Sequence, residues 1–272
     1  MHIQLPNQIL YAYTGGKAPD PAQPTVVFIH GVLHDHSVWI LQSRYLAHHG
    51  WNVLAIDLPG HGRSGGEAPS SVEEAAQAIT ALLDAAGLQR AALVGHSWGS
   101  LSALETAARL SSRISHLVLV GTAFPMKVSA ALLETSLKQP QEAIRMINVF
   151  SRATLAPPPS GLGPGTWVYG TSMALNRRIL ASNTRVNLLH RGFMACDQYA
   201  RGLQAMAEVQ APVLFVLGQQ DQMTAPKAAV SLIDQAHASG KTFRVVTVPV
   251  GHHQMFESPD ATLQALQEFL RP

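Results

Sequence analysis

The chain has 272 residues, of which 47% are hydrophobic and only 13% are charged. This composition excludes a disordered chain and suits one sizeable globular core, with room for an inserted subdomain. A net charge of +2 gives no strong attraction for nucleic acid, so no nucleic-acid partner is expected. The single cysteine, Cys196, cannot form an internal disulfide and fits a reducing compartment.

The first 13 residues carry too much polarity for a signal peptide, and no later apolar run approaches the length of a membrane span. The default expectation is therefore a soluble cytoplasmic protein that has no membrane partner. The sequence carries no signal for the oligomeric state.

Strand and helix patterns alternate along the first 123 residues. Apolar runs predict strands at 25–30, 52–56, 91–94 and 114–120, and a helix is predicted at 71–86, where a Ser-Val-Glu-Glu segment provides a capped start. Such alternation is typical of an α/β fold with a doubly wound, mainly parallel sheet.

The alternation stops between residues 124 and 206, where helical segments surround Pro157-Pro158-Pro159 and the glycine-rich stretch 161–165. Strand runs resume at 213–217 and 243–248. The prediction is a core in two parts, 1–123 and 207–272, with a helical cap inserted at 124–206. The cap carries nine lysines and arginines against three acidic residues, which indicates either a solvated outer helix face or a preference for anionic substrates.

The strongest functional signal is the sequence GHSWG at residues 95–99. It follows the apolar run at 91–94 and precedes a helical pattern at 101–108. Glycines two residues before and two after Ser97 permit a sharp strand-to-helix turn that exposes the serine hydroxyl. This context favours a nucleophile over a surface serine in a glycine-rich turn.

A serine hydroxyl needs a base before it can attack, together with an orienting carboxylate and donors for the oxyanion. His252 lies in the loop after the strand at 243–248, so it can return to the sheet edge where Ser97 is expected. Its neighbour His253 competes for the same role.

The carboxylate is expected at Asp221, just beyond the strand at 213–217.

These segments together resemble an α/β-hydrolase-fold serine hydrolase of the carboxylesterase type with a helical cap. TVVFIHG at 25–31 is similar to the strand that enters the family's His-Gly oxyanion loop, and DLPGHGRS at 57–64 matches a turn motif common in the family. The chain order Ser97, Asp221, His252 is also that of the family.

The resemblance implies roles for particular residues. The family places its histidine directly after a glycine, which favours His252 over His253 as the base. Its fold can also supply the acid after the strand at 114–120, but residues 121–124 contain no carboxylate, so the resemblance leaves Asp221 without a rival there. The backbone N–H groups of Val32 and Trp98 are the implied oxyanion donors. Side chains of His34, Trp39 and Met126 are candidates for the substrate pocket, although Trp39 equally suits core packing.

The expected function is hydrolysis of a small-molecule carboxylic ester through an acyl-enzyme on Ser97, with no cofactor and no metal. Residues 30–36 hold three histidines and an aspartate, but their loose spacing and the lack of Cys or Glu give a metal site little support. Thioesterase, lactonase and C–C bond hydrolase activities would use the same triad. A slow-turnover ligand receptor of the same fold is the alternative from another class.

Overall fold

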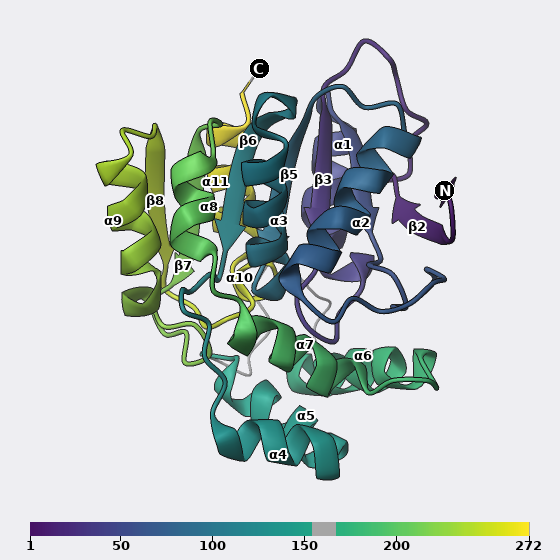
Figure 1. Cartoon of the computed structure of the whole chain (residues 1–272), viewed down its shortest axis with the longest axis vertical. Coiled ribbons are helices and arrows are strands. Elements are labelled where there is room, and N and C mark those ends of the chain that lie inside the picture. Colours follow the sequence, from purple (N-terminus) through teal and green to yellow (C-terminus); the bar gives the residue numbers. More distant parts are fainter. Residues whose placement is uncertain (154–166, 272) are drawn as a thin grey trace.

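The computed structural model describes residues 1–153 and 167–271, so the proline and glycine segments at 157–159 and 161–165 lie outside the described residues. An eight-stranded sheet forms the centre, in the order β1-β2-β4-β3-β5-β6-β7-β8 (Figure 1). The strands are β1 (His2–Gln4), β2 (Ile9–Tyr13), β3 (Thr25–Ile29), β4 (Asn52–Ile56), β5 (Ala91–His96), β6 (Ile114–Val120), β7 (Val213–Gly218) and β8 (Phe243–Val248).

The predicted α/β fold is confirmed, because β3 to β8 all pair in parallel. The predicted strands at 52–56, 114–120 and 243–248 have the observed bounds, and the other three differ by one or two residues at one end. The antiparallel pairs made by β1 and β2 at one side of the sheet were not predicted. Their signal is weak because only Ile3, Leu10 and Ala12 of these strands are buried.

Helices cover both faces of the sheet. On one face lie α2 (Val72–Ala85), α3 (Trp98–Arg109), α8 (Gly202–Glu208) and α9 (Val230–Ala238), and on the other lie α1 (Ile40–Ala47) and α11 (Pro259–Phe269) (Figure 1). Successive residues of a strand point to opposite faces of the sheet. In β3, Val27 and Ile29 pack in the hydrophobic cluster under α2 and α3, whereas Val26 and Phe28 pack in the cluster under α1 and α11. A sheet covered on both faces explains why its strands are continuous apolar runs.

Shorter helices complete the core at its loops: η1 (His36–Trp39), η2 (Ser111–Arg113), η3 (Pro226–Ala229) and α10 (Gln254–Glu257). The helix predicted at 71–86 is α2, and the Ser71 hydroxyl caps it by accepting the N–H of Glu74 at 3.1 Å. Within the described ranges, no helix combines the length and the apolar character needed to cross a lipid bilayer.

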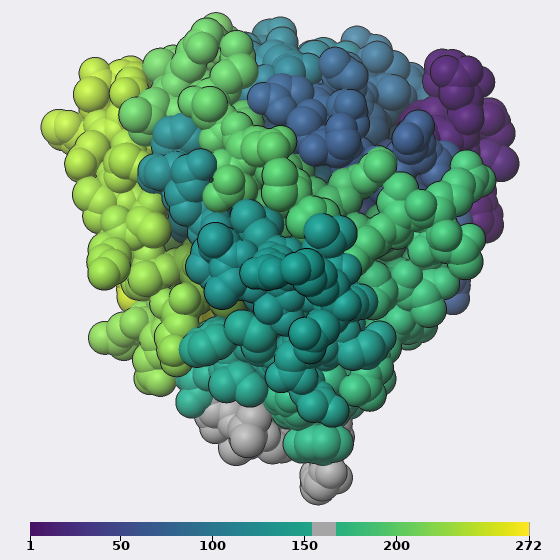
Figure 2. Space-filling model, turned by 60° about the horizontal axis from the view of Figure 1, so that its bottom comes forward, coloured from purple at the N-terminus to yellow at the C-terminus, as the bar shows by residue number. Residues whose placement is uncertain are grey.

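The segment between β6 and β7 contributes α4 (Ala130–Lys138), α5 (Pro140–Phe150), α6 (Val168–Ser182) and α7 (Leu188–Gln198), which lie beyond the carboxyl ends of the parallel strands (Figure 1). Seen from that end, their side chains form the surface over the centre of the molecule (Figure 2). These helices have a hydrophobic cluster of their own that includes Ile144, Ile179 and Leu189. The next helix, α8, packs against α3 and α9 of the core, so the boundary predicted at residue 206 falls within a core-packed helix.

Candidate active site

Ser97 stands at the corner between β5 and α3 with φ 54° and ψ −122°, in a region that non-glycine residues rarely adopt. The corner is crowded. A Cβ on Gly95 would come 2.1 Å from the carbonyl oxygen of Gly99, and one on Gly99 would come 2.5 Å from that of His30. Both glycines are therefore required by the close approach of β5, α3 and the loop after β3, and the Ser97 backbone is fixed by its N–H bond to Val120 O at 2.9 Å.

Asp221 and His252, predicted from separate strand ends, are in contact. His252 Nδ1 lies 2.8 Å from Asp221 Oδ2. The other carboxylate oxygen of Asp221 accepts the backbone N–H groups of Met223 and Thr224, both at 2.8 Å. The Thr224 hydroxyl oxygen lies 2.8 Å from Asp221 Oδ2, 2.9 Å from Gly121 O and 3.0 Å from His252 Nδ1.

The charge of Asp221 follows from these contacts. Burial, which leaves the residue 4% exposed, would raise the pKa of its carboxyl, but the His252 ring and the donors of Thr224 lower that pKa well below its usual range. An ionised carboxylate only accepts hydrogen bonds, so the proton on the imidazole lies on His252 Nδ1. In this tautomer of the neutral ring, Nε2 carries a lone pair and can accept a proton.

Sequence reasoning missed Thr224. Its signal was the spacing Asp-x-x-Thr at 221–224, because an aspartate readily accepts the N–H groups two and three residues later in a turn. The hydroxyl of Thr224 bonds Gly121 O at the end of β6, while Asp221 itself follows β7. Contacts at the ends of two strands thus position the aspartate.

Ser97 and His252 line a common cavity of about 330 Å³ beneath α4, α5 and α7. In the described part of the chain no hydrogen bond joins their side chains, a looseness that is common in unliganded active sites. The walls are mainly apolar: Val32, Met126, Val128, Leu132, Met146, Phe150, Phe193, Cys196 and Met223. Met126 thus lies where the sequence suggested a pocket residue.

A second cavity of about 40 Å³ adjoins Ser97 and His252 and is lined by polar groups that include His34. Trp39, in contrast, is fully buried in the core cluster, with its ring centroid 5.1 Å from that of Phe28. It does not line either cavity that contains Ser97. The pocket role suggested for Trp39 is therefore corrected to its alternative, core packing.

The loop after β3 passes directly beside Ser97. A Cβ on Gly31 would lie 3.1 Å from Ser97 Cβ, and Val32 lines both cavities. Trp98 begins α3, so its N–H has no partner within the helix. For the described residues, no backbone hydrogen bond occupies the N–H of either Val32 or Trp98. Two donors beside the serine are thus available to a ligand.

His30 has a structural position in this loop. Its Nε2 accepts the N–H of Leu58 at 3.1 Å, and its Nδ1 lies 2.8 Å from Gly31 O. The ring therefore joins the loop after β3 to the one after β4. Burial lowers its pKa and keeps it neutral.

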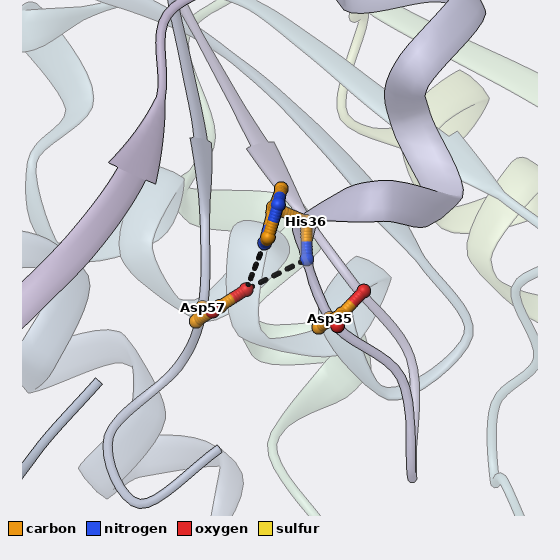
Figure 3. Close-up of side chains that lie close together, drawn as sticks. All are labelled: Asp35, His36 and Asp57. Atoms are coloured by element: carbon orange, nitrogen blue, oxygen red, sulfur yellow. Dashed lines mark hydrogen bonds and ion pairs between the residues drawn. The ribbon is translucent and has the colours of Figure 1, made fainter. Parts of the chain in front are cut away.

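Beyond His34, the loop forms a compact polar cluster of Asp35, His36 and Asp57 (Figure 3). One oxygen of Asp57 accepts both the N–H and the ring Nδ1–H of His36 at 2.7 Å, and the other accepts the N–H of Arg63 at 2.9 Å. Each oxygen of this carboxylate already has a protein donor.

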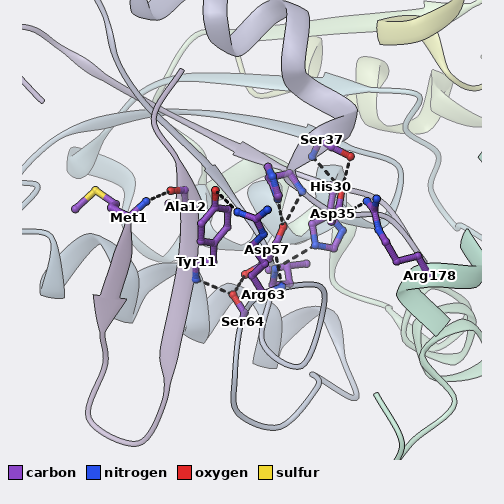
Figure 4. A network of polar contacts seen from close by, with 12 residues as sticks. Met1, Tyr11, Ala12, His30, Asp35, Ser37, Asp57, Arg63, Ser64 and Arg178 are labelled. Atoms are coloured by element: carbon purple, nitrogen blue, oxygen red, sulfur yellow. Dashed lines mark hydrogen bonds and ion pairs between the residues drawn. The ribbon is translucent and has the colours of Figure 1, made fainter. Parts of the chain in front are cut away.

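Asp35 is similarly satisfied. One of its oxygens accepts from the backbone and hydroxyl of Ser37, and the other lies 2.6 Å from the guanidinium of Arg178, which reaches across from α6 (Figure 4). Because the positive guanidinium already occupies this carboxylate, the cluster is better suited to supporting the loop by hydrogen bonds than to binding a metal cation. The cluster fastens the loop to β4 on one side and to the cap on the other.

Residues 24–259 match the family described as alpha/beta hydrolase fold. The acetyltransferase component of the acetoin cleaving system from Pseudomonas putida is 26% identical over 260 residues, which cover 94% of this chain and 65% of that protein. The chain spans less than two thirds of the length of the curated relatives it matches.

Solved structures agree on the fold. The esterase EaEST from Exiguobacterium antarcticum is 18% identical with a TM-score of 0.81, covering 98% of each chain. The enol-lactonase from Burkholderia xenovorans is 19% identical with a TM-score of 0.78, covering 99% of each chain. These proteins differ in chemistry, so the similarity alone does not select a substrate.

Proposed function

The chain belongs to the α/β-hydrolase family, and from that premise we propose that it is a serine esterase that cleaves carboxylic esters through an acyl-enzyme on Ser97. The observation that carries the proposal is the strained Ser97 corner opening into the same cavity as His252, whose other ring nitrogen is bonded to the buried carboxylate of Asp221. A fixed hydroxyl, a base and an orienting acid are the parts that acyl transfer to serine needs.

In this mechanism His252 Nε2 takes the Ser97 proton as the hydroxyl oxygen attacks the ester carbonyl. Asp221 stabilises the imidazolium that forms and keeps its ring oriented. The N–H groups of Val32 and Trp98 bind the oxyanion, each contributing about 3 kcal/mol to lowering the barrier. His252 then gives its proton to the departing alcohol, and a water activated by the same ring releases the acid.

The walls of the 330 Å³ cavity support a neutral, fairly apolar substrate. Among the described residues that line this cavity, Lys127 is the cationic one. It donates to Asp197 O at 2.7 Å, with the Asp197 carboxylate 3.6 Å away. Other bases of the cap also face acids, as in the pairs Lys138–Glu134 and Arg145–Glu142. Arg178, Arg191 and Arg201 pair with the core acids Asp35, Glu67 and Glu105. Within the described part of the chain, six of the nine bases of the cap thus face an acid, which favours uncharged esters over acyl-CoA or other anionic substrates.

The test is a panel of short nitrophenyl esters, lactones and acyl-CoAs with the wild type and Ser97→Ala. We expect ester turnover well above about one per minute, a loss of about 10⁴-fold or more in Ser97→Ala, and covalent labelling of Ser97 by an organophosphonate. Matching circular dichroism spectra would show that the variant folds.

Two results would overturn the proposal. One is full turnover by Ser97→Ala. The other is a single sluggish turnover accompanied by a ligand-dependent thermal shift, which would instead identify a receptor of the same fold.

A further inference from the structure

The 40 Å³ cavity beside Ser97 differs in chemistry from the large one. Besides Ser97, its polar lining consists of His34, His96, His252 and His253 of the core and of Asn148, Ser151 and Asn176 of the cap. This space is called the polar pocket below. The volume suits one or two waters or a group of a few heavy atoms. The pocket therefore offers hydrogen bonds to something small that lies next to the nucleophile.

Several polar atoms around the pocket lack partners. Over the described ranges, Nδ1 of His34, Nδ1 of His96, Nδ1 of His253 and Oδ1 of Asn148 are buried and have no hydrogen bond. Buried polar atoms without partners are costly and uncommon in native proteins. Four of them around one small space indicate that a ligand group or water completes the arrangement.

The rings are neutral. Burial lowers the pKa of His96 to about 3 and holds the pKa values of His34 and His253 well below their usual range. Nε2 of His96 donates to His252 O at 2.8 Å, so its Nδ1 is a bare acceptor. The rings of His34 and His253, with centroids 5.0 Å apart, can each present a donor or an acceptor.

Asn148 adds a second acceptor of defined orientation. Its amide nitrogen donates to Ile144 O at 2.8 Å and to Asn176 Oδ1 at 2.7 Å. Asn176 in turn donates to Leu33 O at 3.0 Å. These bonds fix the amide, so the free Oδ1 of Asn148 is an acceptor held in place by cap and core together.

We propose that the polar pocket binds a short, uncharged acyl group that carries a hydroxyl next to the carbonyl, so that the preferred substrates are esters of small 2-hydroxy acids. A hydroxyl can donate to Asn148 or His96 and accept from His34 or His253. Among the described residues, no lysine, arginine, aspartate or glutamate lines this pocket, which disfavours a charged group. This inference rests on the proposed esterase function.

The acyl side of the ester is assigned to this pocket because of its size and enclosure. Core residues form one wall and cap residues such as Ile147 and Phe193 form the other. The acyl group stays bound to Ser97 until water attacks, whereas the alcohol has to leave first. The larger cavity, more than eight times the volume, is the better place for the leaving alcohol.

The experiment compares phenyl glycolate with phenyl propanoate, in which a methyl group replaces the hydroxyl at equal size. Each kcat/KM is divided by the rate constant for hydroxide hydrolysis of the same ester, which removes the difference in intrinsic reactivity. We expect a corrected ratio of about tenfold or more in favour of the glycolate, the usual value of one or two hydrogen bonds to buried groups.

Two variants test the pocket, His34→Phe and His253→Phe. Neither ring makes a hydrogen bond among the described residues, so each change removes nitrogen atoms without breaking one. The corrected ratio should fall towards one in both. His116→Phe is the matched control, since His116 packs against Phe269 near the opposite end of β6, and its ratio should equal that of the wild type.

The outcomes are distinct. Hydrolysis of phenyl esters without a glycolate preference overturns this inference and leaves the esterase proposal standing. A preference that survives both pocket variants also overturns it, as does slower deacylation of both esters at an unchanged ratio, which would assign the pocket to water. Failure of the wild type to hydrolyse any ester would instead remove the proposed function itself.

Discussion

The core and the cap line the same cavities, but different kinds of contact fix their positions. At the core, backbone atoms meet backbone atoms, as where Gly99 lies against the carbonyl of His30. The cap meets the core through a backbone bond from His252 N–H to Ser151 O at 2.7 Å and through apolar packing around Leu33. Most of its polar contacts with the core are made by the tips of side chains: Asn176 to Leu33 O at 3.0 Å, Asn183 to Gly60 O at 3.1 Å, Arg191 to Ala68 O at 2.7 Å and Arg178 to Asp35 at 2.6 Å.

We infer from this difference that the core fixes the positions of the reacting groups, whereas the cap determines which substrate binds. Backbone packing in a close-packed core has little freedom, so the strand ends set the positions of Ser97, Asp221 and His252 closely. Side-chain tips can shift or change by single substitutions without disturbing the sheet. We therefore expect changes at the core edge to abolish activity or folding, and changes in the cap to alter binding and local mobility.

The largest effect is expected from Asp221→Asn. An amide at this position can donate to His252 Nδ1, which reverses the tautomer and removes the free base facing the cavity. The value of kcat should fall by about 10³- to 10⁴-fold, measured with a nitrophenyl ester. Asp197→Asn changes a carboxylate of the cap that pairs with Lys127, and it should keep kcat within about threefold. Equal losses in the two variants would contradict the division between core and cap.

The next effect concerns folding and uses two helical glycines. In Gly99→Ala, the new Cβ would lie 2.5 Å and 2.6 Å from backbone oxygens of His30 and Ile29, which cannot move without shifting β3. We expect a loss of about 4 kcal/mol or more in the free energy of unfolding. In Gly170→Ala of the cap, the neighbour is the ring of Trp167, which is 65% exposed and can rotate away.

For Gly170→Ala the expected change is a small gain of at most about 1 kcal/mol, because alanine favours a helix over glycine. Urea unfolding of both variants measures the contrast. A stable Gly99→Ala protein with wild-type activity would show that α3 and the end of β3 can move apart more easily than the structure indicates.

The same contrast explains what could be predicted from the sequence. The core strands were predictable because both faces are buried, which leaves uninterrupted apolar runs of four residues within β3, β4 and β6. The glycines around Ser97 and the loops after β7 and β8 carried the site, since parallel strands end at one edge. Short, local sequence patterns are enough to predict backbone geometry of this kind.

The cap and the polar pocket were not predictable in the same way. Contacts such as Asn176 with Leu33 or Arg178 with Asp35 join residues 143 positions apart and have no local pattern. The neutral state of His34 and His253 depends on burial by several elements at once. Trp39 was suggested as a pocket residue and lies in the core, because no local pattern distinguishes an aromatic residue of a pocket from one of the core.

Acid should lower the free energy of unfolding through two buried histidines of the core. Burial lowers the pKa values of His61 and His96 from 6.5 to about 3, while in the unfolded chain they return to the ordinary value. Between these pKa values the unfolded state binds more protons, so stability is full above pH 6.5 and falls as the pH drops towards 3. Each histidine contributes a loss of about 1 kcal/mol per pH unit in this window.

The measurement is the urea midpoint and free energy of unfolding of the wild type, His61→Phe and His49→Gln at several values between pH 7 and pH 4. His61→Phe should reduce the slope of stability against pH by about one proton, whatever its effect on stability at pH 7. His49→Gln is the control for replacing an exposed histidine. A slope that is equal in all three proteins would mean that His61 is not neutral in the folded state.

The smallest effect is expected from Arg178→Ala, which removes the ion pair between α6 and Asp35. The Arg178 side chain is 61% exposed, so the free energy of unfolding should change by less than about 1 kcal/mol. Hydrogen exchange of α6 amides should nevertheless become faster relative to β5, since one of the contacts joining cap to core is lost. Arg177→Ala is the matched control on the same helix, because Arg177 bonds only to Gln141 of α5 among the described residues and thus acts within the cap. Equal acceleration in both variants would show that the stability of the cap itself, and not its attachment through Asp35, governs the motion of α6.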